Sequence, residues 1–248
     1  MGVFTPQEVI EGIYLIKGGR PSSHVYLVRS RTKNVLNDSG TREGFDDLAA
    51  SLSELGLAPS DIDVVINTHE HFDHIGANVH FANSAVIAAH RLAATKLERS
   101  DEYVTMHTRT GDDSRSTVPT PHLWLEDKNL FDLGDFHLQV AHTPGHTSGS
   151  ICLYEPIRRL LFSGDTVFAR GTLPAIAPSG SAGDYMSSLS QLVTKKIALL
   201  LPGHGKISDQ PEADIFAALD FARDGLSEAA VLGGEDTWSE STPLEAFV

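Results

Sequence analysis

The sequence lacks the features that mark several classes of protein. Its 248 residues contain one cysteine, Cys152, which excludes an internal disulfide. No apolar run approaches the ~20 residues that a membrane span needs. The first residues, MGVFTPQEVIEG, have no basic segment followed by an apolar one, so no secretory signal is predicted. We therefore expect a cytoplasmic protein with no membrane partner.

Positive charge is also scarce. The chain has 19 Lys and Arg residues against 33 Asp and Glu residues, which gives a formal net charge of −14. Such a surface repels the phosphates of nucleic acids and of anionic membranes. Nucleic acid is therefore not expected as a partner. We expect a small-molecule substrate. The sequence leaves a homodimer open.

The hydrophobic pattern predicts alternating strands and helices. Apolar and β-branched runs predict strands at 13–16, 24–28, 33–37, 63–67, 85–88, 136–141, 150–154, 159–163 and 198–202. Apolar residues at helical spacing predict helices at 45–55, about 89–98, about 184–196 and 211–231. Thr41 is the predicted N-cap of the first helix, and Gly56 its predicted end. The order fits two similar α/β halves packed sheet against sheet.

Two segments lack a regular pattern. Residues 99–128 are polar and contain Pro119 and Pro121. A loop of that length in a compact domain is usually functional or mobile. We interpret residues 1–248 as a single domain with a loop or helical insertion at 95–130 and a C-terminal helix at 211–231. The residues after that helix are predicted to be poorly ordered.

The most informative stretch is THEHFDHIG at 68–76, directly after the predicted buried strand 63–67. It places His69, His71, Asp73 and His74 within six positions. Imidazole nitrogens and carboxylate oxygens are good ligands for zinc, iron and manganese. Four ligands so close in sequence rarely all face one ion, so two neighbouring ions are sterically easier.

Three further ligand-type residues stand just after predicted strands. They are His146 in HTPGHTSGS, Asp165 in FSGDT and His204 in LLPGHG. Functional groups gather at strand ends in this way in α/β sheets. One such histidine is usually structural, but seven ligand-type residues at strand exits predict a metal site. The remaining histidines lack this context and are not expected to be ligands, with His24 left open: His80, His90, His107, His122, His137 and His142.

With these residues in place, the sequence resembles the metallo-β-lactamase superfamily. The resemblance runs from about Ile13 to Gly205 and includes the flanking stretches LNDSG, HTPGHTSGS and FSGDTVF. It implies an α/β fold, an αββα sandwich of two mixed β-sheets flanked by helices. It also implies two divalent metal ions at one edge between the sheets, with Zn²⁺ favoured over iron or manganese.

The resemblance implies a role for each ligand-type residue. The first ion would be held by His69, His71 and His146. The second would be held by Asp73, His74 and His204, with Asp165 bridging both. Asp38, in LNDSG, matches a position that supports the site by hydrogen bonding, a role that metal-bound histidines generally need. Relatives with a di-iron oxygen-reducing centre carry Glu where His71 stands, so that branch is disfavoured.

Two bound ions imply hydrolysis. A metal pair ~3.5–4 Å apart lowers the pKa of a shared water to about 7 and so supplies hydroxide, which attacks a small ester, thioester or lactone. Asp73 would orient the hydroxide and accept its proton. Glyoxalase II and lactonases are the relatives of this type. However, Arg223 is the only basic residue from Pro211 onward, so a basic grip on glutathione is not expected.

The substrate contacts are the least defined part of the prediction. The candidates are residues in or near loops: Phe168, Arg170, Tyr103 and Trp124. Packing or solvation explains each of them equally well. Three alternatives to the hydrolase stay open. One is a mononuclear iron persulfide dioxygenase using His69, His146 and Asp165, the second is a β-lactam hydrolase, and the third is a non-catalytic metal-binding protein.

Overall fold

Two β-sheets form the centre of the computed structural model, which describes residues 5–99, 101 and 119–231. Within these residues the first sheet has seven strands, in the order β1 (Gln7–Ile10), β2 (Ile13–Ile16), β3 (Val25–Arg29), β4 (Asn34–Asn37), β5 (Val64–Asn67), β6 (Val86–His90) and β7 (Leu123–Leu125). The second has five, in the order β12 (Leu199–Pro202), β11 (Leu160–Gly164), β10 (Ile151–Glu155), β9 (His137–His142) and β8 (Leu130–Asp132). Both sheets mix antiparallel and parallel neighbours.

The predicted strands are confirmed to within two residues at their ends, but three strands were not predicted. These are β1, β7 and β8, and each is the edge strand of its sheet. The prediction that 99–128 is irregular is wrong where β7 pairs in parallel with β6. Leu123 and Trp124 on β7 are 42% and 49% exposed. Short, exposed edge strands bury little apolar surface, so their sequences carry a weak signal.

Four helices lie near their predicted positions: α1 (Phe45–Glu54), α4 (Arg91–Glu98), α6 (Ala182–Val193) and α7 (Pro211–Val231). The short helices α2 (Phe72–Ile75) and α3 (Asn78–Phe81) and the 3₁₀ turns η1 (Pro59–Asp61) and η3 (Ala169–Gly171) were not predicted. Gly56 follows α1 with a φ of 74°, which suits a helix end at glycine. The prediction that Thr41 is the N-cap is wrong, because Gly44 holds that place. The Thr41 hydroxyl instead accepts the Gly44 N–H (3.2 Å) within a turn that precedes the helix.

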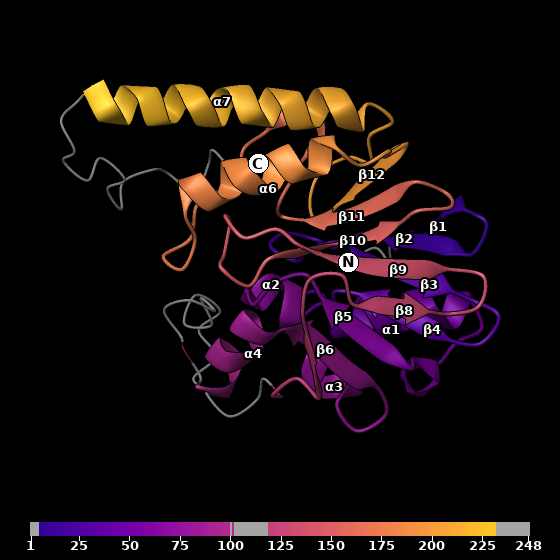
Figure 1. The fold of residues 1–248 in the computed structure, drawn as a ribbon. Helices are drawn as coiled ribbons and strands as arrows, with labels where there is room; N and C mark the ends of the chain where they lie inside the picture. The colour runs from indigo at the N-terminus through magenta and orange to yellow at the C-terminus, as the bar shows by residue number, and fades with distance from the viewer. Residues whose placement is uncertain (1–4, 100, 102–118, 232–248) are drawn as a thin grey trace.

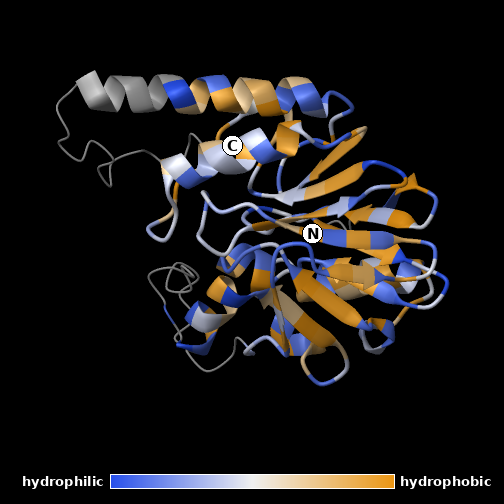
Figure 2. Ribbon diagram, viewed as in Figure 1, coloured by the Kyte–Doolittle hydropathy of each residue, from blue (hydrophilic) through white to orange (hydrophobic). Residues whose placement is uncertain are grey.

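Three hydrophobic layers confirm the αββα sandwich. Side chains alternate along each strand, so Tyr26 and Val28 of β3 face the layer between the two sheets, and Val25 and Leu27 face the layer that includes α1. A third layer lies between the five-stranded sheet and helices α6 and α7. Figure 1 shows α6 and α7 on one outer side of the sandwich and α3 and α4 on the other. The strands are mostly hydrophobic in Figure 2, as burial on both faces requires. None of the described helices is long and apolar enough to cross a membrane.

Candidate metal centre

The predicted site residues come together at one edge of the sandwich because five strands end there. The residues that follow these ends are Asp38 after β4, His69 after β5, His146 after β9, Asp165 after β11 and His204 after β12. Backbone hydrogen bonds join the two sheets at this edge. Ile151 N–H donates to the Thr68 carbonyl (2.8 Å), and His24 N–H donates to the Gly203 carbonyl (2.7 Å). These bonds fix the segments that carry the ligand-type side chains relative to one another.

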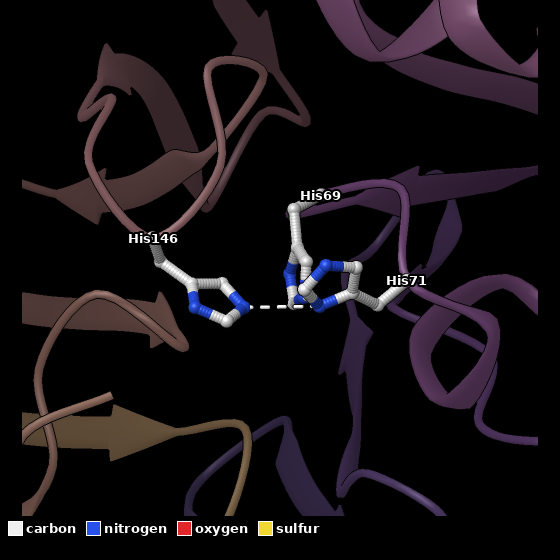
Figure 3. Close-up of side chains that lie close together, drawn as sticks. All are labelled: His69, His71 and His146. Atoms are coloured by element: carbon white, nitrogen blue, oxygen red, sulfur yellow. Dashed lines mark hydrogen bonds between the residues drawn. The ribbon is translucent and has the colours of Figure 1, made fainter. Parts of the chain in front are cut away.

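The residues of the first predicted ligand set lie together (Figure 3). His71 Nδ1 is 3.0 Å from His69 Nε2 and 3.0 Å from His146 Nε2. Two nitrogens bound to one tetrahedral zinc at its usual bond lengths are about 3.3 Å apart. All three rings are buried. The three nitrogens therefore converge at a spacing that suits one ion.

The residues of the second predicted set form an adjoining group. Asp73 Oδ2 is 3.1 Å from His204 Nε2 and 3.6 Å from His74 Nε2. Asp165 lies between the two groups, with Oδ1 3.3 Å from His74 Nε2 and Oδ2 3.8 Å from both His146 Nε2 and His204 Nε2. A carboxylate in this place can offer one oxygen to each of two ions.

Hydrogen bonds on the far side of the rings orient them. Asp38 Oδ1 accepts the Thr68 N–H (2.7 Å), and Asp38 Oδ2 accepts the Thr68 hydroxyl (2.9 Å) and His74 Nδ1–H (2.9 Å). Because the Thr68 hydroxyl donates to Asp38, its oxygen can accept His69 Nδ1–H (3.1 Å). This network places Nδ1–H of both rings on the far side, so that Nε2 is the atom of each ring that faces the cluster.

The His146 ring is oriented in the same way from another segment. Its Nδ1–H donates to the Ala175 carbonyl at 2.5 Å, which leaves Nε2 as the atom that faces His71. Ala175 lies in the loop between η3 and α6. Sequence reasoning did not anticipate this partner, because a backbone carbonyl is present at every residue and carries no pattern.

Burial and neighbouring charges set the protonation of the cluster. Burial, followed by the charges of neighbouring histidines, holds the pKa of His69 and of His71 well below the usual value. Burial opposes charge on Asp165, but His74 and His204 outweigh it and hold the pKa of that carboxyl well below its usual value. For His74, burial is in turn outweighed by the surrounding carboxylates, which raise its pKa well above the usual value. His69 and His71 are therefore neutral, which is the form that binds metals.

The donor set fits divalent metal ions. Among the described residues, His74 Nε2 and Asp165 Oδ1 are buried with no hydrogen-bond partner. Such atoms are costly unless another group satisfies them. Gly203 keeps the space beside them open, because a Cβ there would lie 2.6 Å from Asp165 Oδ1 and 2.7 Å from His74 Cε1. Imidazole and carboxylate ligands together suit zinc, iron or manganese.

The predicted substrate contacts lie in different places. The Phe168 ring centroid is 6.4 Å from that of His204, so Phe168 borders the cluster. Arg170 follows in the 3₁₀ turn with a φ of 65°, and its N–H donates to Asp214 Oδ1 (2.6 Å). Trp124 lies on edge strand β7, and no described hydrogen bond or ring contact links it to the cluster. Tyr103 lies outside the described residues, so its role stays a prediction.

A cavity of about 580 Å³ lies between the loop 17–23 and the start of α1. Its lining includes apolar residues and charged residues of both signs: Leu48, Phe72, Lys17, Arg20, Glu43 and Asp47. Phe72 belongs to α2, the short helix that also carries Asp73. The cavity therefore adjoins an element of the metal-binding cluster, although no pattern in the sequence indicated it.

Glu70 is the polar residue in this region that sequence reasoning missed. It stands between His69 and His71 and is completely buried, yet its carboxylate faces Thr147 and Lys96 and not the cluster. Side chains alternate in direction along an extended segment, so a residue between two metal ligands points away from the metal. This alternation was the signal that could have placed Glu70 behind the cluster.

Residues 18–204 match the family model of the metallo-beta-lactamase superfamily. The chain is 34% identical over 205 residues to acyl-coenzyme A thioesterase MBLAC2 of Gallus gallus, which covers 73% of this chain and 72% of that protein. It is 32% identical over 157 residues to hydroxyacylglutathione hydrolase of Maricaulis maris, covering 62% of this chain and 53% of that protein.

The fold has a close counterpart among solved structures. A metallo-beta-lactamase family protein of Thermus thermophilus superposes with a TM-score of 0.78 at 22% identity, covering 91% of this chain and 84% of that one. A sandwich of this kind with a His and Asp cluster at its edge defines a class of metal-binding enzymes, and the relatives above are hydrolases. The chain belongs to the metallo-β-lactamase superfamily.

Proposed function

We propose that the protein is a binuclear metal-dependent hydrolase that acts on small thioesters, with esters and lactones as related substrates. The observation that carries this proposal is the pair of adjoining ligand groups, His69 with His71 and His146, and Asp73 with His74 and His204. Asp165 lies within 4 Å of members of both groups. A single-ion site would not need the second group.

The side chains have distinct tasks in this proposal. Two bound divalent ions would lower the pKa of a shared water to about 7 and polarise a substrate carbonyl. Burial opposes charge on Asp73, but His74 and His204 outweigh it and lower the pKa of its carboxyl. The carboxylate is therefore ionised and can orient the attacking water by accepting a hydrogen bond at Oδ1 or Oδ2, and in this proposal it also passes the proton of that water to the leaving group. The Asp73 side chain is 15% exposed, whereas that of His74 is fully buried, so Asp73 is the one that substrate can reach.

Thioesters are the favoured substrate class because two relatives are named for them. Acyl-coenzyme A and hydroxyacylglutathione are both thioesters, and the two enzymes named for their hydrolysis are 34% and 32% identical to this chain. The cavity beside α2 is the proposed seat for the part of the substrate that does not react. Its apolar residues would take an acyl chain.

A substrate panel tests this function. The metal-loaded protein should be assayed with acyl-coenzyme A thioesters, hydroxyacylglutathione, simple esters, lactones, β-lactams and single-stranded RNA. We expect the highest kcat/KM with a thioester and no cleavage of RNA, since the net charge of −14 repels a polyanion. A preference for β-lactams would replace the thioester assignment, and efficient RNA cleavage would contradict the charge argument.

Metal content tests the binuclear part of the proposal. Elemental analysis of the purified protein should give two metal equivalents per chain, with zinc as the expected ion. One tightly bound iron and no second ion would favour the persulfide dioxygenase, whose ligands would be His69, His146 and Asp165. Oxygen consumption with glutathione persulfide would then decide between the two reactions.

A further inference from the structure

Glu70 lies at the centre of a second polar cluster, behind the metal-binding one. Its side chain is fully buried, and its partner Lys96 on α4 is only 16% exposed. Lys96 Nζ donates to Glu70 Oε1 and to Ser148 Oγ (2.6 Å). A buried charge is tolerated only when it is paired and hydrogen-bonded, and Glu70 meets both conditions.

The remaining contacts of Glu70 reach the loop that carries His146. The Thr147 hydroxyl donates to Glu70 Oε2 (2.9 Å), and Ser179 Oγ donates weakly to Oε1 (3.4 Å). Gly149 lies so close that a Cβ on it would be 2.7 Å from Glu70 Oε2. The carboxylate therefore touches three segments outside its own: α4, the loop 143–150 and the loop before α6.

These contacts cross between the two halves of the chain. His69 and His71 come from the turn after β5, in the half that forms the seven-stranded sheet, and His146 comes from the loop after β9 in the other half (Figure 3). Within 143–150 the Thr147 hydroxyl also receives the Gly149 N–H (3.2 Å), and the Thr147 N–H donates to Ser150 Oγ (3.1 Å). Glu70, which binds the Thr147 hydroxyl, thus also fixes the turn that carries His146.

We propose that the buried Glu70–Lys96 pair is a positioning device that fixes the His146 loop against the His69 and His71 turn and thereby sets the affinity of the first metal ion alone. The effect on the loop depends only on these contacts. The effect on metal affinity rests on the proposed binuclear function.

Hydrogen exchange in the metal-free protein tests whether Glu70 holds the loop 143–150. Glu70→Gln keeps the shape of the side chain but leaves the Lys96 ammonium without its counter-charge, so exchange of the amides at 145–150 should be faster by at least about tenfold. The double variant Glu70→Gln/Lys96→Met lacks both the pair and the hydrogen bond from Lys96 to Ser148, so its exchange should stay at least as fast as that of Glu70→Gln. Glu126→Gln is the control, because it breaks an exposed ion pair with Arg91 on the same helix α4 (2.7 Å).

Metal affinity is tested by chelator competition with zinc in two backgrounds. His204→Ala disables the second ligand group, and there Glu70→Gln should weaken zinc binding by about 10–100-fold, as loss of a supporting partner typically does. His146→Ala disables the first group, and there the same substitution should change the affinity by less than about threefold. In the His204→Ala background the double variant should keep the weakened affinity, because it also lacks the pair.

Each outcome is decisive. Unchanged exchange at 145–150 in Glu70→Gln overturns the positioning role. Wild-type exchange in the double variant overturns it too, because it would show that the loop is held without the pair. Equal loss of zinc affinity in both backgrounds overturns the claim that only the first ion is affected. If the wild-type protein binds no zinc, the proposed function fails, while the exchange measurement still decides whether Glu70 holds the loop.

Discussion

Asp38 Oδ2 lies 2.9 Å from His74 Nδ1, and both side chains are completely buried. Asp38 has a φ of 63°, a left-handed conformation that costs a non-glycine residue of order 1–3 kcal/mol unless its surroundings hold it. Here Thr68 holds both carboxylate oxygens through its N–H and its hydroxyl. The strained backbone therefore aims one carboxylate at two histidines of the cluster, one directly and one through Thr68.

Replacing Asp38 should weaken metal binding more than it weakens the fold. Asp38→Asn keeps the size of the side chain but removes the charge that holds His74 Nδ1–H, so zinc affinity should fall by about 10–100-fold. Chelator competition measures this directly. Asp63→Asn is the matched control, since Asp63 forms an exposed ion pair with Lys33 (2.6 Å) and should leave zinc affinity unchanged. An Asp38→Asn protein with native affinity would remove Asp38 from the site.

His71→Ala and Asp73→Ala should each abolish hydrolysis without unfolding the chain. Both residues lie at the start of the short helix α2 and outside the hydrophobic clusters. Loss of a direct ligand should lower kcat/KM by at least about 100-fold, the upper range for a supporting partner. The melting temperature should be compared in the metal-free state, because bound metal itself stabilises the native protein. Retained hydrolysis in either variant would contradict its assigned role.

Gly203→Ala should close the space between Asp165 and His74. The added Cβ would lie 2.6 Å from Asp165 Oδ1, so side chains must shift at a cost of about 1–3 kcal/mol. We expect reduced metal content by elemental analysis together with a lower melting temperature. Gly183→Ala on α6 is the control, since its nearest contact would be Ser181 Oγ at 3.7 Å. A Gly203→Ala protein with full metal content would show that the cluster tolerates a wider spacing.

The stability of the metal-free protein should pass through a maximum near pH 6.5. His69 and His71 have a folded-state pKa below the unfolded value of about 6.5, so only the unfolded state takes up these protons as the pH falls below that value, and stability is lost. His74 has a raised folded-state pKa, so its contribution is full below about 6.5 and is lost as the pH rises through the folded value. Urea denaturation across pH 5–9 measures both limbs. Removing His74 by His74→Gln should flatten the alkaline limb, and an unchanged limb would contradict the assignment.

Local patterns in the sequence predicted most of the strands and the ligand-type residues at their ends, and the αββα sandwich was implied by the family resemblance that these residues carry. Apolar runs such as DVVIN and RLLFS end in small residues followed by ligand-type side chains, and burial of such runs is a property of the run itself. The short edge strands β1, β7 and β8 could not be predicted in this way. β7 is held by backbone pairing with β6, and its exposed Trp124 gives no periodic signal.

Which side chains meet was decided only by the tertiary structure. His71 and His146 are 75 positions apart, and their nitrogens lie 3.0 Å from each other because the two sheets pack face to face and are hydrogen-bonded at one edge. In the sequence, Glu70 looks like a metal ligand, because it carries a carboxylate and lies between His69 and His71. Only the direction of its side chain, set by the extended turn between His69 and His71, places it behind the cluster against Lys96 and Thr147. Burial and periodicity act over a few residues, whereas such contacts depend on how distant segments pack.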